Sequence, residues 1–264
     1  MKANWKWALM GLAALAFVAC KPGNGGKDDP EDPDEKEYVK PISVGDNSLA
    51  DWDALPAEFV YDAVCPADAA MLGLKSVKVY ADKFYIFLQV EPNPEDIVDL
   101  EWVPFHVYIN TDNSDATGGY GDEFLDANAD VLLEGAVFVN ADAASFAEAA
   151  IPYAPAVFHW WGEVGGSGWD WSDPAVEHSG DDKWGAVIGE GELQGTTSQF
   201  VNGKFEMEIM RELVPTKAGW SEDAFGIGFD IQQNWSSVGV LPCASATDEN
   251  PAGHAAKLTI KIDK

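Results

Sequence analysis

Apolar and polar residues alternate with a period of two in several separated stretches of the sequence, and this pattern most constrains the fold. In AFGIGFDIQ, the residues Phe225, Ile227, Phe229 and Ile231 alternate with small or polar residues, and KFEMEIM repeats the pattern over 204–210. Successive side chains of a β-strand point to opposite faces, so each stretch predicts a strand with one buried face. The sequence shows no long stretch with the period of a helix.

Further strands are expected where alternation recurs between turns rich in Gly, Asn and Asp. These stretches lie at 58–62, 75–81, 83–90, 102–110, 130–140, 157–163, 185–190 and 257–262. Short helical turns are expected at 141–150 and 214–218. Half-buried strands in this number predict an all-β protein, an antiparallel β-sandwich that is jelly-roll-like and has long loops.

The first twenty residues indicate export. Lys2 and Lys6 precede an apolar run over 8–19, which is shorter than the roughly 20 residues of a membrane span and is typical of a secretory signal peptide. The run ends in FVAC, which resembles the lipobox of bacterial lipoproteins. The resemblance implies a signal peptide of residues 1–19, cleavage before Cys20, and a lipid such as palmitate on that residue. A conventional signal peptide that is cut nearby is the alternative.

Residues 20–37 contain Pro, Gly and acidic residues but no Leu, Ile, Val or aromatic residue. Such a segment cannot bury enough apolar surface to offset its ordering entropy, so a disordered tether is expected. Its acidic run behind Cys20 resembles the surface-export signal of lipoproteins in Bacteroides-like bacteria. That resemblance implies an outer-membrane lipoprotein that faces the cell exterior, and a plain spacer is the alternative.

Residues 38–264 remain as one domain, which is long enough to bury a substantial core. The chain carries a net charge of -29, so nucleic acid is not expected as a partner, and membrane contact is expected through the lipid anchor only. Besides Cys20, the cysteines are Cys65 and Cys243. Outside the cytoplasm these two form either a disulfide or a pair of buried thiols.

The segment FHWWGEVGGSGWDWS at 158–172 combines four tryptophans with four glycines. Neighbours in an extended chain point to opposite faces, so Trp160 and Trp161 are not expected to enter the same face of the core. Trp169 and Trp171 are two residues apart and would share a face. Two indoles on one face would form a platform for the apolar C–H faces of pyranose rings. The alternative is a loop that folds over a small hydrophobic cluster.

Acidic residues in and near this segment would accept hydrogen bonds from sugar hydroxyls, and a further tryptophan would extend the platform. The candidate glycan-binding residues are Trp160, Trp161, Trp169, Trp171, Trp184, Glu163 and Asp170.

A second candidate site is the acidic segment INTDNSDATGGYGDEFLDANAD at 109–130. Calcium takes six to eight oxygen ligands, chiefly carboxylates and carbonyls. The candidate calcium ligands are Asp112, Asn113, Asp115 and Asp122. Their spacing differs from that of an EF-hand, and a hairpin loop built on Asx-turns is the alternative.

Five further segments follow one another in a distinctive order: GDNSLADWDALP (45–56), VKVYADKFYIFLQVE (77–91), FHVYINTDNSDATGGYG (105–121), KFEMEIMRELV (204–214) and GFDIQQNW (228–235). Their order resembles that of family 9 carbohydrate-binding modules and their relatives. The resemblance covers most of 40–264, although 151–182 matches no motif of the family. It implies a β-sandwich that binds saccharides, often with structural calcium.

Together these patterns predict a surface-anchored, non-catalytic glycan-binding lipoprotein that holds polysaccharide near uptake machinery. The four histidines lack metal-ligand spacing, and no nucleophile or phosphate-binding motif occurs. The alternatives are a structural or protein-interaction subunit of a cell-surface complex and, third, a glycoside-active enzyme.

Overall fold

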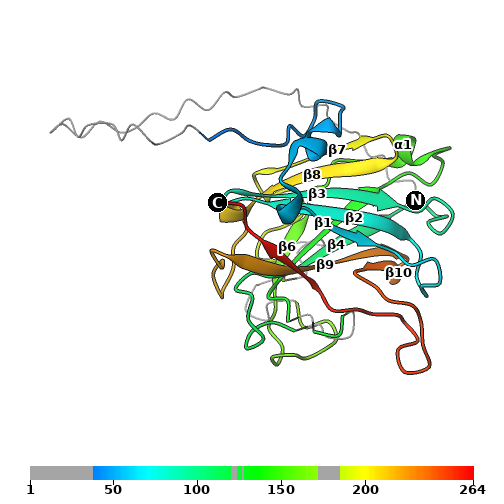
Figure 1. Cartoon of the computed structure of the whole chain (residues 1–264). Coiled ribbons are helices and arrows are strands. Elements are labelled where there is room, and N and C mark those ends of the chain that lie inside the picture. Colours follow the sequence, from blue (N-terminus) through cyan, green and yellow to red (C-terminus); the bar gives the residue numbers. More distant parts are fainter. Residues whose placement is uncertain (1–37, 120–123, 127, 172–184) are drawn as a thin grey trace, which may run out of the picture. The chain divides into compact units, whose positions relative to one another are not determined.

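The alternating segments form two antiparallel sheets that lie in two layers, as Figure 1 shows. The computed structural model describes residues 38–119, 124–126, 128–171 and 185–264. The predicted signal peptide, Cys20, the tether, Asp122 and Trp184 therefore lie outside the described residues. Contacts group residues 40–264 into one compact unit.

The first sheet has the strand order β1-β2-β3-β8-β7. Its strands are β1 (Tyr61–Val64), β2 (Leu74–Ala81), β3 (Tyr85–Pro92), β7 (Thr196–Val201) and β8 (Lys204–Met210). The second sheet has the order β10-β9-β4-β5-β6, and β11 pairs with the first half of β9. Its strands are β4 (Val103–Asn110), β5 (Val131–Phe138), β6 (Ala156–His159), β9 (Ala224–Gln233), β10 (Ser236–Leu241) and β11 (Leu258–Lys261).

The core lies between the two sheets and contains the residues that the alternation predicts. Ile86 and Leu88 of β3 and Met207 of β8 are fully buried against Phe105 of β4 and Phe229 of β9. The rings of Phe105 and Phe229 stack with their centroids 6.1 Å apart. The prediction of an all-β antiparallel sandwich is therefore confirmed.

Helical structure in the described part of the chain is short. It consists of α1 (Phe146–Ala149) and the 3-10 turns η1 (Ala50–Ala54), η2 (Ala57–Phe59) and η3 (Arg211–Leu213). The turn expected at 214–218 instead ends at Leu213, directly after β8. No helix within the described ranges is long and apolar enough to cross a membrane.

Three strand predictions are corrected by the structure. Residues 185–190 do not form a strand, because only Ile188 bridges to Val157 of β6. The strand expected at 58–62 begins only at Tyr61, and the one expected at 157–163 ends at His159, which pairs with the first residue of β5. Strands β7 and β10 are edge strands whose sequences lack clear alternation, which explains why no strand was expected there.

The N-terminal segment covers the outer face of the first sheet. Ile42 and Trp52 pack on Tyr80 of β2 and Phe87 of β3. The indole Nε1 of Trp52 donates a hydrogen bond of 2.8 Å to Glu206. On the second sheet, a loop covers only one half of the outer face.

Candidate functional site

One half of the second sheet's outer face lies under a hydrophobic cluster that includes two of the predicted platform tryptophans. Trp171 is 0% exposed and Trp160 is 7% exposed. Their ring centroids lie 5.2 Å apart, and Trp171 also packs on Tyr108 of β4. Gly119 makes room for this packing, because a Cβ there would lie only 2.1 Å from the Trp160 ring.

The expectation that Trp169 and Trp171 share an exposed face is therefore wrong. No strand forms over residues 160–171, so the two-residue spacing does not place the rings on one side. Trp171 turns into the cluster, whereas Trp169 is 46% exposed. The loop thus covers a small core, as in the alternative interpretation, and leaves one of these two rings outside.

The two exposed tryptophans of the loop have different surroundings. Trp161 faces Lys217, whose Nζ lies 2.9 Å from the ring centroid. The ring of Trp169 lies 6.0 Å from that of Phe158 and 6.4 Å from that of His106. Of these two exposed tryptophans, Trp169 is therefore the one that contacts the outer face of the sheet. Trp160 is buried and Trp161 is 41% exposed, so the two do not both enter the core, as expected.

The backbone carbonyls of Glu163 and Asp170 stabilise this loop. The Glu163 carbonyl accepts a hydrogen bond of 2.9 Å from Trp160 Nε1. The Asp170 carbonyl accepts one of 2.8 Å from the Trp161 amide. Both side chains are exposed, so their predicted hydrogen bonds to sugar hydroxyls stay a prediction.

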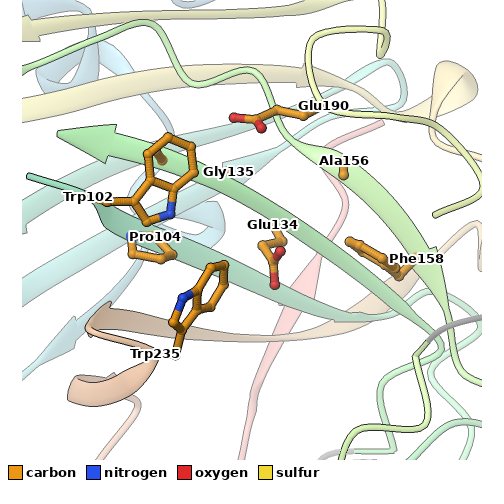
Figure 2. A pocket seen from close by; sticks show the side chains of 9 residues that line it. Trp102, Pro104, Glu134, Gly135, Ala156, Phe158, Glu190 and Trp235 are labelled. Atoms are coloured by element: carbon orange, nitrogen blue, oxygen red, sulfur yellow. The ribbon is translucent and has the colours of Figure 1, made fainter. Parts of the chain in front are cut away.

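The other half of the same face forms a groove with a cavity volume of about 220 Å³. Figure 2 shows the indoles of Trp102 and Trp235 at one end, the Glu134 carboxylate between them and Phe158. Trp102 lies just before β4, and Trp235 lies in the turn between β9 and β10. The residues that line the groove are Trp102, Pro104, Glu134, Gly135, Ala136, Ala156, Phe158, Glu190 and Trp235.

Trp235 is displayed by an unusual turn. Asn234 and Trp235 form the loop of the β9–β10 hairpin, with φ of 49° and 61°. A two-residue hairpin loop with both φ values positive favours Asn followed by Gly, because a bulky residue is strained in this conformation. The Trp235 side chain is nevertheless 65% exposed. Backbone strain of this kind clusters at functional sites.

A buried charged row crosses the sheet beside the groove. The register pairs His106 of β4 with Glu134 of β5 on one side and with Asp230 of β9 on the other. His106 Nε2 lies 3.1 Å from a Glu134 oxygen, and Nδ1 lies 3.6 Å from an Asp230 oxygen. Burial lowers the pKa of His106, but Asp230 and Glu134 favour the imidazolium more strongly and raise this pKa to about 9.

Sequence reasoning missed the groove residues, although signals for some of them exist. Glu134 is the one acidic residue in the otherwise apolar VLLEGAVF segment. Trp235 occupies a turn position where Gly is favoured. Neither signal shows that Trp102, Glu134 and Trp235 lie together. Their proximity depends on the order of the strands in the sheet, which these local signals do not reveal.

The acidic segment at 109–130 contains Asx-turn geometry in its described part. The Asp112 carboxylate accepts hydrogen bonds from the Ser114 amide at 3.1 Å and from the Thr117 hydroxyl at 3.0 Å. Asn113 follows with φ of 54°. Asp115 lies 3.7 Å from Lys257 Nζ instead.

At the base of this segment, Asp130 accepts hydrogen bonds from the Thr111 amide and hydroxyl. Burial raises the pKa of Asp130 to about 6. Among the residues that the structure describes, no three His, Cys, Asp or Glu side chains gather as metal ligands. Calcium binding by Asp112, Asn113 and Asp115 therefore stays a prediction.

The two remaining cysteines lie close together. Cys65 follows β1 of the first sheet and Cys243 follows β10 of the second, with their Sγ atoms 3.6 Å apart. Both are free thiols in this structure, and burial raises the pKa of each. The predicted choice between a disulfide and two buried thiols stays open.

The groove combines exposed indole rings with carboxylates on an otherwise apolar floor. Indole faces stack on apolar or cationic groups, and carboxylates accept hydrogen bonds from hydroxyl or ammonium groups. Such a mixture of apolar surface and few polar groups is typical of small-molecule sites. Comparison with protein-family models gives no match, and no curated protein matches the chain either.

Proposed function

We propose that the groove binds a glycan and that the protein is a non-catalytic glycan-binding lipoprotein. The observation that carries the proposal is the pair of exposed indoles, Trp102 and Trp235, at the end of a groove that has Glu134 on its floor. Pyranose rings present apolar C–H faces for stacking and hydroxyl groups for the carboxylate. This placement replaces the platform expected from the tryptophan loop, of which Trp169 lies next to the groove residue Phe158.

The size and position of the groove suit a chain better than an isolated small molecule. Its volume of about 220 Å³ lies below the roughly 300–1,000 Å³ of pockets that enclose drug-sized ligands. Because the groove lies on an open sheet face, a saccharide held there would extend beyond it into solvent. We therefore expect the groove to bind a few sugar units within a longer oligosaccharide.

The turn that displays Trp235 supports a binding role over a structural one. A core aromatic is buried, but 65% of the Trp235 side chain is exposed in this strained turn. A bound sugar ring would cover this surface. Large exposed aromatic surface otherwise indicates a protein partner, which is the alternative of a protein-interaction subunit in a cell-surface complex.

Affinity electrophoresis in gels that contain soluble polysaccharides tests the proposal. The wild type should be retarded by at least one polysaccharide, and Trp102→Ala should lose that retardation. Trp161→Ala is the matched control, because Trp161 is a similarly exposed indole outside the groove. Retardation that survives Trp102→Ala but not Trp161→Ala, or no retardation by any polysaccharide, would contradict the proposal.

The anchor is part of the same proposal: a lipid on Cys20 would hold the groove at the cell exterior, near uptake machinery. Cys20→Ala should release the protein from the membrane fraction or leave an uncleaved precursor. A variant that still fractionates with the outer membrane after a high-salt wash would contradict the lipoprotein proposal.

A further inference from the structure

The charged residues that the structure describes along the groove are acidic. Two carboxylates, Glu134 and Glu190, line it, and none of the described lining residues is Lys or Arg. Glu134 is paired with His106, which Asp230 flanks on its other side. One imidazolium between two carboxylates leaves this buried row with a net negative charge.

The buried row strengthens the negative potential at the floor. Asp230 is fully buried, and its Oδ1 has no hydrogen-bond partner among the described residues. Electrostatic interactions are stronger in such surroundings than in water, because the local dielectric constant is lower. A positive group in the groove would therefore be attracted, whereas a uronate or sulfate would be repelled.

The tryptophans at the end of the groove also favour a positively charged ligand. Trp102 and Trp235 present indole faces, which attract cations through the ring quadrupole. A neutral sugar stacks on these faces and donates hydroxyl hydrogen bonds to the carboxylates, but it carries no charge for the negative floor to attract. An ammonium group uses both the rings and the carboxylates.

We infer that the groove prefers glycans that bear protonated amino groups, such as glucosamine units, over neutral glycans and excludes uronic-acid glycans. This inference rests on the proposed glycan binding. It specifies the ligand class from charge complementarity between the floor, the walls and the sugar.

Isothermal titration with matched oligosaccharides tests the inference. The probes are a β-1,4-glucosamine oligomer, its N-acetylated form, neutral β-glucan and mannan oligomers, and a galacturonate oligomer, at about pH 6, where amines are protonated. The amino form should bind about tenfold or more tightly than its acetylated form, which is the contribution of one charge-assisted hydrogen bond. Added salt should reduce this advantage, because screening weakens charge attraction.

Variants separate charge from stacking. Glu190→Gln should reduce the advantage of the amino form without weakening neutral binding, and Glu134→Gln should reduce it further. Glu190 is exposed, so the first variant remains informative if the second one fails to fold. Trp161→Ala should leave every affinity unchanged.

The outcomes distinguish the inference from the proposed function. Neutral or galacturonate oligomers that bind as tightly as the amino form, or more tightly, would overturn the inference and leave glycan binding intact. An amino-form advantage that Glu190→Gln and Glu134→Gln leave unchanged would also overturn it. No binding to any oligomer would overturn both.

Discussion

Replacing Trp235 with Gly should separate binding from stability, because this residue occupies a strained turn and is 65% exposed. A left-handed conformation costs a non-glycine residue about 1–2 kcal/mol, which Gly would recover. A fully buried Trp covers about 150–250 Å², so the buried third of Trp235 contributes about 1–2 kcal/mol at about 25 cal/mol per Å². Gly also costs roughly 0.5–1 kcal/mol of extra chain entropy.

These contributions nearly cancel, so we expect the free energy of unfolding of Trp235→Gly to lie within about 1 kcal/mol of the wild type. Trp171→Ala is the contrasting variant, because loss of a fully buried Trp costs about 3–5 kcal/mol. Binding should show the reverse order: truncation of an aromatic contact that dominates binding costs about 2 kcal/mol or more, which is roughly 30-fold in Kd.

Urea unfolding and titration calorimetry measure the two quantities on the same preparations. The reasoning would be refuted if Trp235→Gly lost more than about 3 kcal/mol of stability, since Trp235 would then be part of the core. Unchanged affinity in a stable Trp235→Gly variant would refute the binding role of this indole.

Three further predictions concern other parts of the structure. The folded-state pKa of His106 is raised from 6.5 to about 9, so its contribution of about 3 kcal/mol to the free energy of unfolding should be complete below pH 6.5 and should be lost as pH rises through about 9. Urea unfolding across this pH range should show the free energy of unfolding decline. In His106→Gln this pH dependence should be flatter. Oxidation by a dithiol–disulfide exchange couple should join Cys65 to Cys243, because their Sγ atoms are close. The disulfide should lower the intact mass by two hydrogen atoms and stabilise the fold by about 2–4 kcal/mol. Thiol-specific labelling of both cysteines that persists under these conditions would contradict this prediction. Calcium should raise the melting temperature if Asp112 and Asp115 bind it, and an unchanged melting temperature would leave only the hairpin-turn role of Asp112.

The core was predictable from the sequence because burial imposes alternation on central strands. Phe105 and Phe229 come from distant strands, yet each belongs to a period-two pattern that identifies its buried face. The edge strands β7 and β10 lack this signal: the side chains of β7 are at most partly buried, and in β10 only the second half of the strand is buried.

The candidate site was less predictable, because strand order and loop packing determine it. Trp171 and Trp169 look equivalent in the sequence, but contact with Tyr108 and Trp160 buries only the first. Trp102 and Trp235 are far apart in the sequence and meet because β4 and β9 are neighbours in the sheet. No local pattern encodes that neighbourhood.

The central claim is that a saccharide contacts Trp102 and Trp235 rather than the cluster around Trp171. Fluorine NMR of protein labelled with fluorotryptophan reports on each indole separately, and single Trp→Phe variants assign the signals. On titration with a saccharide that binds, the signals of Trp102 and Trp235 should shift to saturation at one common Kd, and those of Trp161 and Trp171 should stay in place. Saturable shifts at Trp161, with none at Trp102 and Trp235, would contradict the account.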